Sequence, residues 1–405
     1  MTPDESAALA KLGGRAAAGV ASHVQQMHQG ISRRVFESVG DSSAPVRLLH
    51  DAVAEPIYSA VGAGLRGAGE LTAFMLRLSG AGGSSRLGEQ PSSNTAISAL
   101  NAVVGHDLAE RDDPLAILMA VRVGGRDMPP ETTAIARAFP GATPRLAVFI
   151  HGLGEHEGAW GVGAADGDPA YGTRLADDLG FSSVYVRYNT GQHVSTNGKD
   201  LSSLLDAVVA GWPVPVERIV IIGHSMGGLV ARAACADRGA NWIPLVSDVV
   251  YLGSPHGGAL LARAARWTAR VLEQLPETQA YAPLLDVSPG VRDMRFGYVA
   301  DDDWAECDAG TCLDDHGTDV PLLGTANHYA VSATVVDDPD TLAGRVVGDL
   351  VVQPASAHGQ TGRSRLQFFD QLNVPGRHHF QLLNDPSIYA AMQDWLAPRG
   401  PGASR

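Results

Sequence analysis

The sequence is poor in cysteine and in positive charge, and each shortage argues against a class of protein. Three cysteines in 405 residues are too few for a disulfide scaffold. The 30 lysines and arginines against 44 aspartates and glutamates give a formal net charge of −14, which argues against a nucleic-acid-binding surface or a polybasic membrane anchor. With 45% apolar residues, the chain is long enough for one large core or for a core with an accessory domain.

Long apolar runs and metal-binding motifs are also missing. No window holds the roughly 18 uninterrupted apolar residues that a membrane-spanning helix needs. The N-terminal stretch "MTPDESAALAKLGG" begins with acidic residues, unlike a secretory signal. No HExxH or paired CxxC motif occurs. The sequence therefore predicts a cytoplasmic protein without a metal, for which peripheral contact with a membrane stays open.

The three cysteines fall into two kinds of sequence context. Cys235 lies in a helical pattern and is predicted to be a small buried residue. Cys307 and Cys312 bracket a short polar loop, "CDAGTC". They can close a local disulfide in an oxidising compartment or stay as two reduced surface thiols, and the sequence leaves both open.

The chain changes character near residue 112. Residues 1–112 are predicted to be helical, and apolar residues recur there at steps of three and four. This stripe consists of Val46, Leu49, Val53, Ile57, Val61 and Leu65. Core packing is favoured for it over a membrane-surface helix, because its polar face is not rich in lysine. Residues 80–93, "GAGGSSRLGEQPSS", have the composition of a flexible linker.

From about residue 113, apolar strands alternate with helices. Strands are predicted in "LAILMAVRVGG", "RLAVFIHGLG", "SSVYVRYNTG", "RIVIIGHS", "VSDVVYLGSPHGG" and "HYAVSATVV". Helices are predicted in "YGTRLADDLG", in "KDLSSLLDAVVAG" and from Met226 onward. This alternation indicates an α/β fold with a mostly parallel sheet that helices cover on both faces.

One polar residue stands at an abrupt corner of this pattern. In "IVIIGHSMGGLVAR", Gly223 and Gly227 frame Ser225 as G-x-S-x-G between a β-branched strand and a helix. Such a turn strains the serine backbone and exposes its hydroxyl above the sheet. The pattern alone is weak, but a strand before it and a helix after it are the context that favours a nucleophile over an inert turn.

A serine nucleophile needs a base and an acid that orients the base, in the chain order Ser, Asp, His. Asp349 in "GDLVV" is the preferred acid, with Asp337 and Asp338 as competitors. In the terminal "GRHHFQLL", His379 is the preferred base and His378 the alternative.

A tetrahedral intermediate also needs two donors for its oxyanion. The N–H of Met226 follows the serine directly, and the N–H of Leu153 lies in the turn "HGLG" after a predicted strand. The His151 side chain is expected to brace that turn rather than to bind a metal.

Five motifs in this order resemble those of the α/β-hydrolase superfamily, in its bacterial lipase and esterase branch akin to triacylglycerol lipases and GPI inositol-deacylase-like proteins. They are "HGLG", "GHSMGG", "GSPHGG", "GDLVV" and "HHFQLL". The resemblance covers roughly residues 115–398. It implies an α/β-hydrolase catalytic domain at 113–400, with a lid-like insertion at 257–325 and a helical N-terminal region in front of it.

The resemblance also implies a serine carboxylic-ester hydrolase of lipid metabolism that acts on small-molecule or lipid esters without a cofactor. In it, Ser225 is the nucleophile, His379 the base, Asp349 its orienting acid, and Leu153 and Met226 the oxyanion donors. Two features depart from the family: leucine follows Asp349 where glycine is common, and the helical N-terminal region has no counterpart in the minimal fold. The same triad serves thioesterases, amidases and acyltransferases, and a catalytically silent binding domain is the rival from another class.

Within the insertion, "ALLARAARWTARVLEQL" has helical apolar spacing and fits either a lid or plain core packing. The acidic stretch "ADDDWAECDAGTCLDDHGTDV" lacks EF-hand spacing, so a solvated loop is favoured there over a calcium site.

Overall fold

The computed structural model describes residues 1–18, 63, 66–76, 86–129, 131–164, 168–259, 288–305, 317–360 and 365–397. Three expectations lie outside the described residues: the apolar stripe formed by Val46, Leu49, Val53, Ile57, Val61 and Leu65, the amphipathic segment at 259–275 apart from Ala259, and the pair Cys307 and Cys312. The described chain divides into two compact units.

The smaller unit includes Met1–Gln90 and Glu110–Leu115. Its described residues 3–18 and 66–76 are helical. Thr2 and Glu5 cap the first helix reciprocally, since the Thr2 N–H donates to Glu5 Oε2 at 2.7 Å and the Glu5 N–H to Thr2 Oγ1 at 3.2 Å. Lys11 pairs with Glu70 across the two helices at 2.7 Å. A short 3-10 helix, η2 (Leu87–Glu89), follows and donates its first N–H to Glu5.

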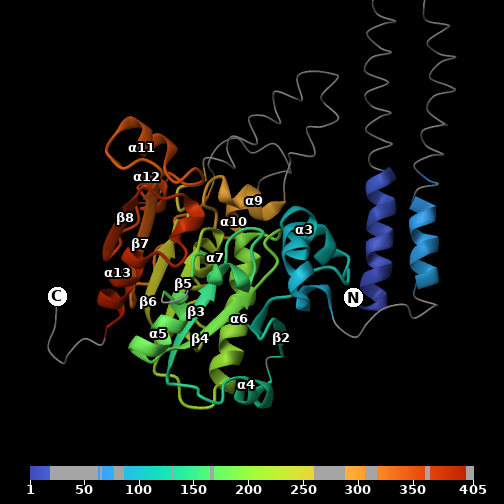
Figure 1. Cartoon of the computed structure of the whole chain (residues 1–405), viewed down its shortest axis with the longest axis horizontal. Coiled ribbons are helices and arrows are strands. Elements are labelled where there is room, and N and C mark those ends of the chain that lie inside the picture. Colours follow the sequence, from blue (N-terminus) through green and yellow to red (C-terminus); the bar gives the residue numbers. More distant parts are fainter. Residues whose placement is uncertain are drawn as a thin grey trace, which may run out of the picture. The chain divides into compact units, whose positions relative to one another are not determined.

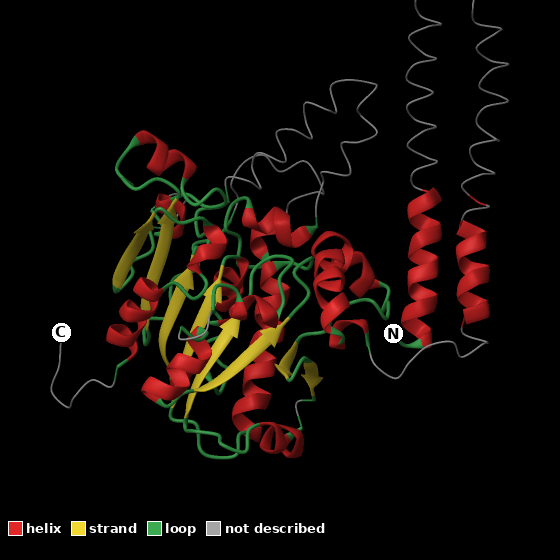
Figure 2. Ribbon diagram, viewed as in Figure 1, coloured by secondary structure: helices red, strands yellow, loops and turns green. Residues whose placement is uncertain are grey.

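The larger unit is built on an eight-stranded sheet in the order β2-β1-β4-β3-β5-β6-β7-β8 (Figures 1 and 2). The strands are β1 (Ala120–Val123), β2 (Arg126–Met128), β3 (Arg145–Ile150), β4 (Ser182–Arg187), β5 (Arg218–His224), β6 (Val246–Leu252), β7 (Asn327–Thr334) and β8 (Asp370–Pro375). Strand β1 pairs antiparallel with β2 and β4, and every other pairing is parallel. The mostly parallel sheet predicted from the sequence is confirmed.

Helices cover both faces of the sheet (Figure 2). The described helices are α3 (Pro91–Glu110), α4 (Thr132–Ala138), α5 (Tyr171–Leu179), α6 (Val194–Gly211), α7 (Met226–Ala234), α9 (Pro289–Met294), α10 (Asp302–Ala305), α11 (Leu342–Val347), α12 (Pro354–Ala357) and α13 (Pro386–Leu396). Short 3-10 helices are η3 (Glu157–Gly161), η4 (Ile243–Leu245) and η6 (His379–Leu382). No described helix is both long and apolar enough to span a bilayer.

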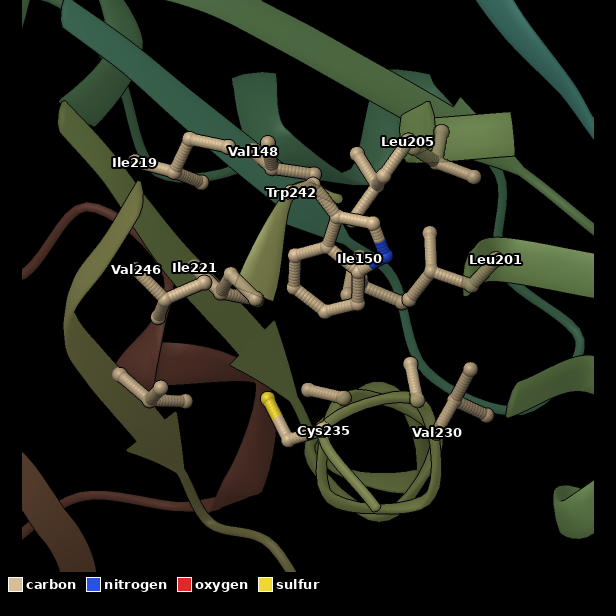
Figure 3. Close-up of a cluster of buried hydrophobic side chains, with 14 of the residues drawn as sticks. Val148, Ile150, Leu201, Leu205, Ile219, Ile221, Val230, Cys235, Trp242 and Val246 are labelled. Carbon is tan, nitrogen blue, oxygen red and sulfur yellow. The ribbon is translucent and has the colours of Figure 1, made fainter. Parts of the chain in front are cut away.

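Strand alternation sends apolar side chains into two cores. On one face, Val148 and Ile150 of β3 meet Ile219 and Ile221 of β5 beneath α6 and α7, around Trp242 (Figure 3). On the other face, Phe149 and its neighbours pack against α5 and α13. Cys235 lies in the first core, as predicted, and burial raises the pKa of its thiol to about 12. Parallel strands aligned in this way bring the loops after β3, β5 and β7 to one edge of the sheet.

Candidate functional site

Ser225 occupies the sharp turn between β5 and α7. Its φ of 53° and ψ of −123° lie outside the regions that residues with a side chain normally adopt. The Ser225 N–H donates to the carbonyl of Leu252 on β6 at 2.8 Å, which fixes the turn against the next strand. A Cβ on Gly223 would lie 2.6 Å from Gly228 Cα, so strand and helix approach too closely for any larger residue.

Asp349 and His379 form a buried pair beside this turn. His379 Nδ1 lies 2.6 Å from Asp349 Oδ2, and the two residues are 3% and 1% exposed. The other carboxylate oxygen accepts from the N–H groups of Val351 at 2.9 Å and Val352 at 2.7 Å. The His379 N–H also donates to the Asp349 carbonyl at 3.1 Å. These contacts orient the imidazole so that its Nδ1–H donates to the Asp349 carboxylate. The second ring nitrogen, Nε2, then carries no proton and can accept one.

The Nε2 atom of His379 is buried and has no hydrogen-bond partner among the described residues. The imidazole nonetheless lies near the turn: a Cβ on Gly253, which follows Leu252, would be 3.0 Å from His379 Cε1. The ring centroid of His379 is 4.8 Å from that of His224, the residue before Ser225. Catalytic hydrogen bonds are often open in a ligand-free protein and close when substrate binds.

The competing acid and base candidates lie elsewhere. Asp337 and Asp338 are exposed, and Asp338 accepts a hydrogen bond from the N–H of Asp340 in a local turn. His378 is exposed, and its backbone N–H donates to Gln381. The structure thus brings together Asp349 and His379 and leaves the three alternatives at the surface.

The loop after β3 lies directly against the serine. A Cβ on Gly152 would be 3.1 Å from Ser225 Cβ. The amides on both sides of Leu153 are engaged: the Gly152 N–H donates to Glu155 Oε2 at 2.7 Å, and the Gly154 N–H to Thr190 Oγ1 at 3.1 Å. The Met226 N–H is the first of α7 and so lacks an intrahelical acceptor. The predicted oxyanion donors Leu153 and Met226 thus belong to the two segments that lie next to Ser225.

His151 is entirely buried beneath this loop, as a bracing residue should be. Its ring stacks on Tyr188 with centroids 4.5 Å apart, and the Tyr188 hydroxyl donates to the His151 carbonyl at 2.8 Å. Burial lowers the pKa of His151 to about 4, so the side chain is neutral at pH 7. No group of residues suited to a metal ion occurs in the described part of the chain.

Helix α9 of the predicted insertion lies beside Met226. The Gly290 N–H donates to the Gly191 carbonyl at 3.2 Å, and a Cβ on Gly290 would be 2.8 Å from Met226 Cε. The buried carboxylate of Asp293 accepts from the Val194 N–H at 2.8 Å at the start of α6. This segment packs onto the loop after β4, beside Met226.

The site also contains a second ionisable pair, which no sequence motif indicates. His224 Nδ1 lies 3.1 Å from Glu155 Oε2, and His224 is fully buried between β5 and the loop that carries His379. Glu155 is the last residue of "HGLGE", and His224 is the middle residue of "GHS". No spacing rule connects them, because the two residues are 69 positions apart.

Comparisons with known proteins agree with this architecture. A family model described as the PGAP1-like alpha/beta domain matches residues 186–284, which contain β5, the Ser225 turn and β6. Together with the strand order, this match confirms the α/β-hydrolase resemblance. No curated protein is significantly similar in sequence.

Solved structures with some similarity include several hydrolases. Est816, an enzyme that degrades N-acyl homoserine lactones, is 16% identical over 63% of this chain and 94% of its own, with a TM-score of 0.34. A thermophilic esterase from Thermogutta terrifontis is 13% identical over 63% and 90%, with a TM-score of 0.34. Mouse alpha/beta hydrolase domain-containing protein 10 is 14% identical over 63% and 90%, with a TM-score of 0.37. The activities in these names are those of the named proteins.

Proposed function

Because this chain has the α/β-hydrolase fold, we propose that it is a serine hydrolase of carboxylic esters and that residues 113–400 perform the reaction. The observation that carries the proposal is the strained Ser225, with φ at 53°, next to a buried Asp349–His379 pair whose outer nitrogen, His379 Nε2, has no hydrogen-bond partner in the described part of the chain. An inert turn requires neither the strain nor the buried pair.

In the proposed reaction, Ser225 Oγ attacks the ester carbonyl while its proton passes to His379 Nε2. Asp349 stabilises the resulting imidazolium through the 2.6 Å contact to Nδ1. The Leu153 and Met226 N–H groups donate to the oxyanion. Collapse of the tetrahedral intermediate breaks the ester C–O bond, and the leaving alcohol takes the proton from His379. Water then attacks the acyl-enzyme by the same steps and releases the acid.

Two exposed apolar side chains support an apolar substrate. Leu350 follows the proposed acid and is 57% exposed, and Phe380 follows the proposed base and is 52% exposed. Exposed large apolar residues next to buried catalytic candidates fit a small apolar or lipid ester better than a charged one. The triad itself does not fix the leaving group, so thioester, amide and acyl-transfer activities are the alternatives that a substrate panel must separate.

Replacement of the proposed nucleophile and base tests the reaction. Hydrolysis of a short p-nitrophenyl ester should be abolished in Ser225→Ala and in His379→Ala, because each variant removes a group that takes part in the transition state. His378→Ala is the matched control and should retain the wild-type rate, because that neighbouring imidazole is exposed. Activity of purified Ser225→Ala within about tenfold of wild type would contradict the proposed nucleophile.

A further inference from the structure

Glu155 and His224 join three loops that meet at the site. Glu155 Oε2 accepts from the Gly152 N–H at 2.7 Å and from His224 Nδ1 at 3.1 Å. His224 Nε2 lies 3.4 Å from the His379 carbonyl, a long contact. The three segments are the loop after β3, the Ser225 turn and the start of η6. Each carries one part of the proposed machinery: an oxyanion donor, the nucleophile and the base.

The hydrogen bonds of His224 define its charge. One ring nitrogen faces a carboxylate oxygen and the other a backbone carbonyl, and both are acceptors only. A neutral imidazole carries one N–H and can satisfy one of them, so both contacts require the imidazolium. Burial opposes this charge, but the Glu155 carboxylate, the His379 carbonyl and Asp349 together raise the pKa of His224. Burial also opposes ionisation of Glu155, yet His224 lowers the pKa of Glu155 to about 2.

Other ionisable groups also face the pair. The His379 ring lies next to His224, with the two ring planes tilted by 41°, and the Asp349 carboxylate that pairs with His379 also favours the imidazolium. His151 acts on Glu155 from the end of β3. At neutral pH, the pair therefore adds no net charge to a site that already contains the Asp349 carboxylate.

We propose that the Glu155–His224 ion pair positions the catalytic machinery by holding the loop of Leu153, the Ser225 turn and the His379 segment in register. This inference rests on the proposed function. A buried ion pair contributes little net stability compared with apolar residues of similar size, so stability alone does not explain charges at this place. Both residues act through other groups: Glu155 through the Gly152 amide, and His224 through the His379 backbone. They are positioning residues.

Glu155→Gln removes the charge while keeping the shape of the side chain. We expect kcat for the p-nitrophenyl ester to fall by about 10²-fold with KM changed by less than about threefold, because misplacement of reacting groups acts on the transition state. The rate at which a fluorophosphonate modifies Ser225 should fall in parallel. Glu157→Gln is the matched control: Glu157 is also a largely buried carboxylate on the next turn, and it pairs with Arg122 at 2.8 Å. It should lose far less activity.

Two further variants keep the test decisive if Glu155→Gln folds poorly. Glu155→Asp retains the charge on a shorter side chain, and its kcat should lie between those of wild type and Glu155→Gln. The double variant Glu155→Gln/His224→Gln leaves no unpaired buried charge. Its kcat should be close to the lower of the kcat values of the two single variants, Glu155→Gln and His224→Gln, because the two residues act as one unit.

The outcomes separate the two proposals. If wild type hydrolyses the ester and Ser225→Ala does not, the function holds. In that case, a Glu155→Gln enzyme with wild-type kcat, or one whose loss equals that of Glu157→Gln, overturns the positioning role alone. Multiplicative losses in the double variant overturn it as well, since they indicate independent residues. Wild-type protein that neither hydrolyses esters nor reacts with the fluorophosphonate overturns the proposed function itself.

Discussion

At the scale of single residues, two groups in the site are held in unfavourable states. Ser225 has a backbone conformation of a kind that costs about 1–3 kcal/mol. The Nε2 atom of His379 is buried and finds no hydrogen-bond partner among the residues that the structure describes, and such a group costs about 1–3 kcal/mol relative to a satisfied one. Both costs fall on residues of the proposed triad, where substrate binding can relieve the second one. Strain at one place, surrounded by well-packed strands, is typical of a site selected for chemistry.

The acid can be tested residue by residue. Asp349→Asn should lower kcat by up to about 10⁴-fold, because the amide no longer favours the Nδ1-protonated tautomer of His379. Asp338→Asn should retain wild-type turnover, since Asp338 is exposed and bonds within its own turn. Steady-state kinetics of both variants decide the assignment. The reverse pattern, with Asp338→Asn inactive and Asp349→Asn active, would place the acid elsewhere.

At the scale of elements, the close packing of β5 against α7 at the Ser225 turn depends on glycine residues. Gly223 lies at the end of β5, and the start of α7 passes directly over it. The conformational freedom of glycine is not the reason for its presence, because no positive φ occurs at Gly223. The requirement is space: strand and helix must meet closely for the turn to project Ser225 out of the sheet.

Gly223→Ala should therefore both destabilise the protein and lower its activity. Its new Cβ would meet Gly228 backbone atoms at 2.6 Å, so α7 must shift away from β5, at a cost of about 1–3 kcal/mol. Gly141→Ala is the matched control, because nothing lies within 4 Å of its added Cβ. Chemical denaturation and ester hydrolysis measure the two effects. Equal stability and activity of Gly223→Ala and Gly141→Ala would refute the steric argument.

At the scale of the whole molecule, buried ionisable groups predict a loss of stability in acid. The pKa of His151 is lowered from 6.5 to about 4 by burial, so the unfolded chain takes up its proton first and stability falls as pH drops through that interval. The pKa of Glu155 is lowered from 4.5 to about 2, so its contribution is present above 4.5 and lost below it. The raised pKa of His224 acts in the opposite sense, and its contribution is lost as pH rises through the folded-state pKa.

The melting temperature Tm, measured as a function of pH, tests these three contributions together. We expect the Tm of wild type to fall from pH 6.5 to pH 4 and again toward pH 2. Glu155→Gln should show a smaller second decline, because one of the carboxyl groups with a lowered pKa no longer titrates while others, such as Glu157 and Asp385, still do, and it should keep the first. A Tm that stays constant from pH 7 to pH 3, or a second decline of equal size in Glu155→Gln, would contradict the assigned shifts.

Much of the fold could be predicted from local sequence because its central strands are buried on both faces. After a polar first residue, β3 reads "LAVFI" and β5 "IVII", and β6 ends in "VVYL"; Gly180 ends α5 in the left-handed conformation. Strand β8 was not predicted. It is an edge strand that contains Pro375 and mostly exposed or half-buried residues, so it carries no apolar pattern.

The sequence also predicted part of the candidate site, the three triad residues, but not the Glu155–His224 pair. Ser225, Asp349 and His379 follow a chain order that a local motif and the strand pattern indicate, and the structure brings the last two into contact. Their catalytic roles stay a prediction. The Glu155–His224 pair could not be found from sequence, because its meaning depends on a contact between two loops and on burial that only the packed sheet creates.

Covalent labelling tests the central claim most directly. Wild-type protein is incubated with a fluorophosphonate, and its intact mass and peptide masses are measured. The proposed mechanism predicts a single phosphonyl adduct on the hydroxyl of Ser225, and no adduct in Ser225→Ala or after denaturation. An unmodified wild type, or an adduct that persists in Ser225→Ala, would contradict the assignment of Ser225 as an activated nucleophile.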